Sequence, residues 1–233
     1  MTRILIALLA LFAIASPAAA EETRLAIRAL TQDAKFIGTS MSGMAVIVED
    51  ADTGEILDQG LTGGTTGDTD RILGETKPRY GALSTADSAV YVSTLDIERP
   101  RRVRVTVRGP IGQPQAQAEA SSVRWVLPGR HVEAGDGWML VVPGFAVDVL
   151  APGAHTYVGD APATMMVTAN VIIICGCPTT PGGTWDSDEI EIRASITRNS
   201  AEVGSYEMAY AGDPSTYSVE IPSADKCVYE VLV

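Results

Sequence analysis

Two cysteines separated by a single glycine are the residues in this chain whose types and spacing best suit chemistry. Cys175 and Cys177 follow the apolar run 171–174 and precede Pro178. In an extended strand, Cα atoms two residues apart lie about 6.5–7 Å from each other, at the limit for a disulfide. Gly176 relaxes this limit because glycine readily adopts positive φ. The stretch therefore predicts a buried strand that ends in a tight Cys-Gly-Cys turn.

The third cysteine, Cys227, leaves three interpretations open. A disulfide from Cys175 or Cys177 to Cys227 would close a loop of roughly fifty residues and stabilise the fold by about 4 kcal/mol. Alternatively, the thiolates of Cys175 and Cys177 would bind Cu(I) or Zn(II), with Met165, Met166 or Cys227 as a further ligand. In the third interpretation, Cys175 and Cys177 form a redox-active disulfide with each other.

Other candidate ligands are scattered along the chain. Met41 and Met44 form a second sulfur pair, and His131 and His155 are the two histidines. A single histidine is more often a surface or hydrogen-bonded residue than a ligand, and we expect this of both. Four acids follow the cysteine turn and could offer oxygen ligands to calcium: Asp186, Asp188, Glu189 and Glu191. A solvent-facing strand would carry such acids as well, and we favour that interpretation.

Enzyme classes find little support in the sequence. With two histidines and no Gly-x-Ser-x-Gly or His-Glu-x-x-His pattern, no nucleophile, base and orienting group can be assembled. The formal net charge of −12 disfavours nucleic acid and anionic membranes as partners, because both repel an acidic protein. We therefore expect a protein that is not an enzyme and needs no cofactor in its leading interpretation.

The first twenty residues have the pattern of a secretory signal peptide. Arg3 precedes the apolar run 4–14, and Ala18-Ala-Ala20 ends the segment. The apolar run is too short to cross a bilayer, which needs about 20 residues. We predict cleavage near Ala20, a periplasmic or secreted location, and no transmembrane segment in the mature chain.

Composition and periodicity predict an all-β fold. After the leader, the sequence has no long segment with the apolar periodicity of an amphipathic helix. Short segments that alternate apolar and polar residues recur between Gly and Pro residues. Segment 101–108 is the clearest strand, with its valines on one face and arginines on the other. Segment 23–30 is predicted as an edge strand. Trp125, Trp138 and Phe145 are expected in the core, since large aromatic residues dominate core energetics.

A hairpin near the N-terminus resembles a known module. The pattern Gly43-Met-Ala-Val-Ile-Val48-x-Asp50-x-x-Thr53-Gly54-x-x-Leu57-x-x-Gly60-x-Thr62 is similar to the transthyretin-like, carboxypeptidase-regulatory-like β-sandwich. The resemblance covers about residues 43–62 and implies an accessory or adhesive module without catalytic residues. The sequence departs from the pattern after Thr62, where a Gly-rich insertion near 63–87 begins.

The Gly/Pro cluster 151–155 is the best candidate for a domain boundary. We expect a transthyretin-like sandwich over 21–152 and an immunoglobulin-like sandwich over 153–233, which makes two tandem antiparallel β-sandwich domains. Strands spaced at roughly 8–12 residues favour the second assignment. Segments 217–222 and 228–231 also resemble the closing strands of fibronectin-type modules.

These observations lead to two functional hypotheses. The first is an exported, non-catalytic binding or assembly module of the cell envelope, whose partner is another protein or an envelope component. The alternative is a periplasmic Cu- or Zn-binding protein that uses Cys175 and Cys177. The hypotheses differ in what happens when the two cysteines are replaced, because a scaffold would lose stability alone whereas a metal protein would lose its ion.

Overall fold

The computed structural model describes residues 20–233 except 75–78, 80, 158–162 and 224–227. Nearly all regular structure in these residues is β, which confirms the expected all-β fold class. The helical elements of the described part are short: η1 (Thr39–Met41), α2 (Thr69–Leu73), η2 (Pro114–Ala116) and η3 (Ser187–Glu189). None of the helices in the described ranges is long and apolar enough to cross a membrane. The leader residues 1–19 lie outside the described residues.

The first pair of sheets consists of a three-stranded sheet, β4-β1-β7, and a four-stranded sheet, β3-β2-β5-β6. The strands are β1 (Glu21–Thr31), β2 (Ala45–Asp50), β3 (Ile56–Leu61), β4 (Tyr91–Ile97), β5 (Arg101–Gly109), β6 (Ala118–Val126) and β7 (Trp138–Val142). β1 is antiparallel to β4 and parallel to β7, so it is the central strand of its sheet. The predicted edge position of this strand is therefore wrong.

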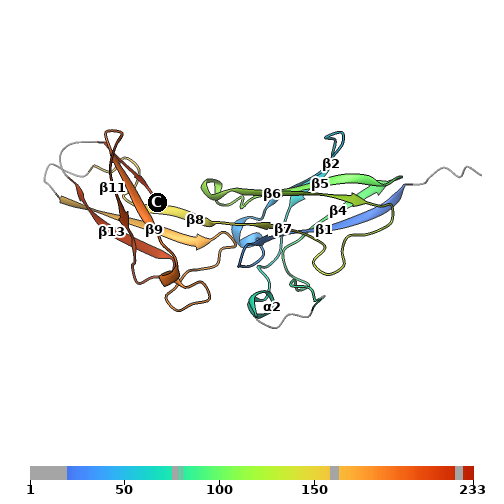
Figure 1. The fold of residues 1–233 in the computed structure, drawn as a ribbon, viewed down its shortest axis with the longest axis horizontal. Coiled ribbons are helices and arrows are strands. Elements are labelled where there is room, and N and C mark those ends of the chain that lie inside the picture. The colour runs from blue at the N-terminus through green and yellow to red at the C-terminus, as the bar shows by residue number, and fades with distance from the viewer. Residues whose placement is uncertain (1–19, 75–78, 80, 158–162, 224–227) are drawn as a thin grey trace, which may run out of the picture.

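The second pair of sheets is built the same way from the remaining strands. Its sheets have the orders β12-β13-β9-β8 and β11-β10-β14. The strands are β8 (Phe145–Ala151), β9 (Ala163–Ile173), β10 (Arg193–Arg198), β11 (Ala201–Glu207), β12 (Ala209–Tyr210), β13 (Thr216–Ser223) and β14 (Tyr229–Leu232). The two pairs lie end to end along the long axis of the molecule (Figure 1).

The chain passes from the first pair to the second at Pro143–Gly144, between β7 and β8. Gly144 has a φ of 134°, a conformation that glycine adopts without strain. β8 pairs with β9 through six residues, so the strand that precedes Pro152 already belongs to the second pair. The Gly/Pro cluster 151–155 thus follows a strand of the second pair.

Strict alternation of apolar and polar residues explains why the sequence predicted strand β5. In β5 the side chains of Val103, Val105 and Val107 are fully buried, and the residues between them face outward. The β2–β3 hairpin also forms as expected, with Val46 opposite Gly60. Asp50 closes its turn by accepting hydrogen bonds at Oδ1 from the amides of Asp52 and Thr53, 3.0 Å each. These bonds lower the pKa of Asp50 below its ordinary value.

The expected core aromatic residues are only partly in the core. Trp138 is fully buried, and its Nε1 donates to Oγ of Ser122 at 2.7 Å. Trp125 is 64% exposed and Phe145 is 42% exposed, so both of these predictions are wrong. The reason is register: Trp125 pairs with Arg102 on the outward face of the sheet, and the next residue, Val126, takes the inward position.

The insertion near 63–87 contains the short helix α2. Asp68 caps this helix, since its side chain accepts a hydrogen bond from the Arg71 amide at 2.7 Å. Ile72 is buried in a small cluster with Phe36 and Ala89. A helix of five residues held by one cap and one buried side chain gives no periodic signal, which explains why the sequence did not predict it.

Candidate functional site

The structure joins Cys175 and Cys177 to each other in a disulfide, with their Cα atoms 5.5 Å apart. Gly176 between them has a φ of 83°, and this conformation brings the Cα atoms closer than an extended strand would. Both cysteines are buried, whereas Gly176 is exposed. The sequence left open a bond to Cys227, a metal site, and a disulfide between Cys175 and Cys177, and the structure contains the last of these. Cys227 lies outside the described residues.

A buried polar network fixes the segment that follows the turn. The Oγ1 of Thr179 lies 2.8 Å from the hydroxyl of Tyr217 and donates to the Val171 carbonyl at 3.1 Å. The Thr179 amide donates to Oγ of Ser215 at 3.1 Å. Thr179, Ser215 and Tyr217 are each at most 2% exposed, so these bonds satisfy groups that have no access to water. These bonds connect the segment after the cysteine turn to β9 and to the start of β13.

The acids after the turn do not gather into a metal site. Oδ1 of Asp186 accepts hydrogen bonds from the amides of Asp188 and Gly182, 3.0 Å each, which lower the pKa of Asp186. Glu191 forms an ion pair with Arg193 at 2.9 Å. Across the described ranges, no three His, Cys, Asp or Glu side chains lie close enough together to hold a metal ion. As a disulfide, Cys175 and Cys177 also lack the thiolates that a metal requires.

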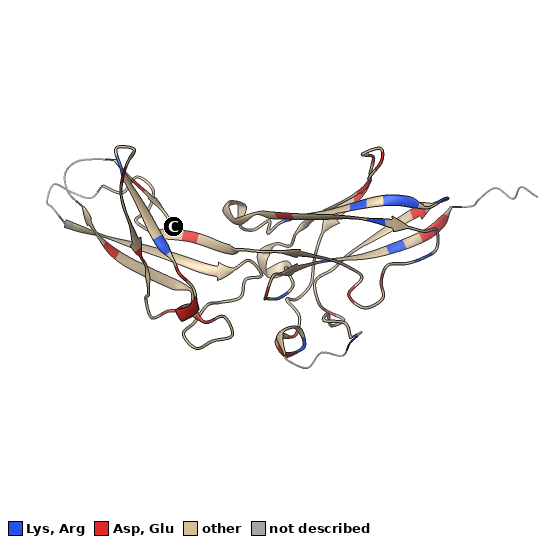
Figure 2. Cartoon of the chain, in the orientation of Figure 1, with Lys and Arg blue, Asp and Glu red and all other residues tan. Residues whose placement is uncertain are grey.

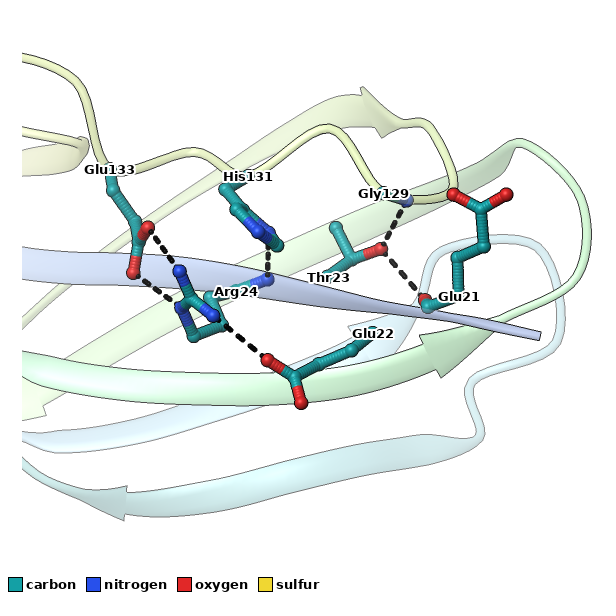
Figure 3. Close-up of polar contacts among 7 residues, drawn as sticks. All are labelled: Glu21, Glu22, Thr23, Arg24, Gly129, His131 and Glu133. Carbon is teal, nitrogen blue, oxygen red and sulfur yellow. Dashed lines mark hydrogen bonds and ion pairs between the residues drawn. The ribbon is translucent and has the colours of Figure 1, made fainter.

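His131 belongs to a polar cluster beside the start of β1 (Figure 3). Its Nδ1 accepts a hydrogen bond from the Arg24 amide at 3.1 Å. The Arg24 guanidinium pairs with Glu133 through two hydrogen bonds and with Glu22 through one, at 2.9–3.2 Å. The bonds from Arg24 lower the pKa of Glu133. The cluster lies at the surface, where ion pairs add little stability, and it fastens segment 129–133 alongside β1.

The arginine-rich strand β5 is balanced by neighbouring acids. Arg102 pairs with Asp52 and Arg104 with Glu49, both at 2.5 Å, and β5 lies beside acidic segments in Figure 2. A face on which most cations already have a carboxylate partner carries little net positive charge. The arginines therefore form a paired, solvated sheet face of the kind that the sequence predicted.

A largely apolar groove lies between β8 and β14, and we call it the β8/β14 groove. Two adjoining cavities of about 640 and 450 Å³ make up the groove, and both are lined by Val149 and Val231. Val147, Leu232 and Val233 add to the lining, and the side chain of Leu232 is exposed. His155, the second histidine, lines one end.

Both strands that border the groove are sheet edges. Within the described residues, β8 pairs with β9 alone and β14 pairs with β10 alone. No further described strand pairs with either of them, and the apolar floor of the groove belongs to the second core. The Val147 carbonyl of β8 accepts a hydrogen bond from Gln115 Nε2 at 3.3 Å. Asp148 is the only acidic or basic side chain apart from His155 among the lining residues, and its Oδ1 accepts from Gln115 Nε2 at 2.6 Å.

The sequence did not point to this groove. The signal was present, because β8 and β14 are mostly apolar, carry one acid each, and contain no Lys, Arg or Pro. Edge strands usually carry such protective residues. Which strands become edges depends on long-range pairing, however, and periodicity alone does not show this.

No family model and no curated protein matches the chain. Among solved structures, it is similar to a chain of the CsuC–CsuE chaperone–tip adhesion subunit pre-assembly complex from archaic chaperone-usher Csu pili of Acinetobacter baumannii. The identity is 12% over 93% of this chain and 86% of that chain, with a TM-score of 0.18. A likeness at this level carries no argument about function.

Proposed function

We propose that this chain is an exported, non-catalytic binding or assembly module of the cell envelope, and that it binds an extended segment of a partner protein in the β8/β14 groove. The observation that carries the proposal is the pair of sheet edges that face one apolar groove. An extended segment adds backbone hydrogen bonds to such an edge and places alternate side chains into the groove. Strand addition would also cover the open side of the second core.

Charge supports a partner protein as the occupant rather than a second copy of this chain. Each copy has a formal charge of −12, and like charges oppose self-association. The groove itself has no Lys or Arg among its described lining residues and contains the carboxylate of Asp148. A segment that alternates apolar residues with a Lys or Arg opposite Asp148 has the matching chemistry.

The remaining parts of the proposal rest on the sequence. Residues 1–20 have the signal-peptide pattern that supports export, and the non-catalytic role follows from the lack of an assembled nucleophile, base and orienting group. The two sheet pairs would act as a transthyretin-like and an immunoglobulin-like module. The Cu or Zn alternative for Cys175 and Cys177 would require their disulfide to open first.

Site-specific photocrosslinking in the producing cells tests the proposal. A photoreactive amino acid replaces Val149 in the groove or Val203 on the opposite edge strand β11, and these side chains are 41% and 42% exposed. We expect a crosslink from position 149 to an extended, apolar and basic segment of another envelope protein, and at least tenfold less product from position 203.

A charge variant provides the control for specificity. Asp148→Lys reverses the charge of the acidic side chain that lines the groove, and we expect it to reduce the yield from position 149 at least fivefold. Equal yields from positions 149 and 203, or an adduct with the mass of two copies of this chain, would contradict the proposal. Recovery of the mature chain in the cytoplasmic fraction would contradict its exported location.

A further inference from the structure

Four sulfur-containing residues belong to the same buried core cluster: Met41, Met44, Cys175 and Cys177. The other buried members of this cluster are aliphatic apart from Trp138. Met41 lies directly against the cysteine turn, since a methyl group placed on Gly176 would be 3.0 Å from Sδ and 3.2 Å from Cγ of Met41. The thioether of Met41 therefore packs against the glycine that separates the two cysteines, although it comes from a segment more than 130 residues away in the sequence.

We propose that the reduced cysteine turn binds one Cu(I) ion through Sγ of Cys175, Sγ of Cys177 and Sδ of Met41. Thiolate and thioether sulfurs are the ligands that Cu(I) prefers. The site lies outside the β8/β14 groove, so the inference does not depend on the proposed binding of a partner strand. The sequence offered Met41 and Met44 as a separate candidate pair and paired the cysteines with Met165, Met166 or Cys227, whereas this site joins Met41 to the cysteines.

The chemistry begins with reduction of the disulfide. A dithiol donor transfers two electrons and two protons to the Cys175–Cys177 bond, which gives two thiols, and the donor becomes a disulfide. Each thiol then releases its proton as it binds Cu(I), whereas the thioether of Met41 binds as a neutral ligand. The two thiolates and the monovalent ion give a centre with a formal charge of −1.

The geometry of the turn suits three sulfur ligands. Metal–sulfur bonds of about 2.3 Å place trigonal ligands roughly 4 Å apart. Cα atoms 5.5 Å apart permit this separation once the covalent bond between the sulfurs is broken. Gly176 is exposed and gives the ion a route from solvent, while the surrounding aliphatic side chains keep water away from the sulfurs.

The same ligand set disfavours Zn(II). Structural zinc sites are almost always tetrahedral and need a fourth protein ligand. The two histidines are used elsewhere in the fold: His131 accepts from the Arg24 amide, and His155 lines the β8/β14 groove. A three-sulfur site without a nitrogen ligand matches the lower coordination number of Cu(I).

Anaerobic titration of the full chain tests the site. The protein is reduced with dithiothreitol, desalted, and titrated with Cu(I) in the presence of bicinchoninate as a competing chelator. We expect one equivalent of Cu(I) in the reduced protein and less than a tenth of an equivalent in the oxidised protein. Replacing both cysteines by alanine should abolish binding.

The two methionines provide a matched pair. Met41→Leu should weaken Cu(I) binding at least tenfold, whereas Met44→Leu should change it less than twofold. Both residues lie in the same core cluster, but Met44 packs against Gly109, where a methyl group would be 2.8 Å from its Sδ. Circular dichroism and thermal unfolding of the variants establish that each one folds.

X-ray absorption of the copper-loaded wild-type protein keeps the proposal testable even if Met41→Leu does not fold. Three sulfur scatterers at about 2.3 Å would support the site. A reduced protein that binds no Cu(I), equal effects of the two methionine variants, or two sulfur scatterers without a third would overturn it.

Discussion

Asp136 anchors the segment that follows α2 to the turn before β7. Its Oδ2 accepts a hydrogen bond from the Leu83 amide at 2.9 Å, and its Oδ1 accepts from the Ser84 amide at 2.8 Å. Burial alone would raise the pKa of Asp136, but these amides and the charge of Arg28 outweigh burial and lower the pKa below its ordinary value. One ionised side chain therefore holds a long connection in place.

The lowered pKa of Asp136 predicts acid-sensitive stability. Its contribution is fully present above the unfolded pKa of about 3.9 and is lost as the pH falls through the lower folded value. We expect Asp136→Asn to reduce the free energy of unfolding at pH 7 by about 1–2 kcal/mol, a value discounted for partial exposure. The difference from wild type should shrink as urea unfolding is repeated toward pH 2.5.

A second variant separates this effect from a general loss of negative charge. Asp96→Asn changes an exposed residue of β4 and should leave the stability within about 0.5 kcal/mol at each pH. If the gap between wild type and Asp136→Asn stayed constant down to pH 2.5, the carboxylate of Asp136 would not be the acid-sensitive group.

Among the elements, β1 shows which part of the fold periodicity can and cannot predict. Leu25 and Ile27 lie two residues apart on one face of this strand, and both are fully buried. The central place of β1 between β4 and β7 comes from pairings with residues about 70 and 110 positions away. Alternation predicts which face of a strand is buried, but the neighbours of the strand are decided by contacts that are distant in sequence.

The central place of β1 predicts unequal effects of two leucine truncations. Leu25→Ala removes side-chain contacts in the middle of the first core and should cost about 2–5 kcal/mol of unfolding free energy. Leu61→Ala on edge strand β3, where the side chain is 55% exposed, should cost less than about 1 kcal/mol. Denaturant unfolding measures both, and equal losses would contradict this account of the core.

The sequence likewise predicted the candidate site at the cysteines only in part. The buried strand before the cysteines and the role of Gly176 follow from residue types alone. The contact of Met41 with the turn and the open edge of β14 do not, because each depends on segments far apart in the chain. The sequence could propose a soft-metal site at the cysteines, but it could not choose among the methionines.

At the scale of the whole molecule, β9 connects the two cores. Val167 and Val171 of this strand are buried in the second cluster, whereas Ile173 and the next residue, Ile174, are buried in the first. A hydrogen bond from Trp185 Nε1 to the Asp33 carbonyl, 3.2 Å long, adds a further link between the two sheet pairs. Because the segment 167–174 packs into both cores, unfolding of the first core should destabilise the second.

Ile174→Ala tests this coupling because Ile174 directly follows β9 and is fully buried. The cavity left by the substitution should reduce the free energy of unfolding by about 3 kcal/mol. If the two sheet pairs unfold as one cooperative unit, amide hydrogen exchange should then become faster by on the order of a hundredfold in both β5 and β13. Val203→Ala, on the exposed edge strand β11, should change neither strand by more than about threefold. Faster exchange in β5 with unchanged exchange in β13 would mean that the two sheet pairs unfold independently, in which case strand binding at the β8/β14 groove would stabilise the second pair alone.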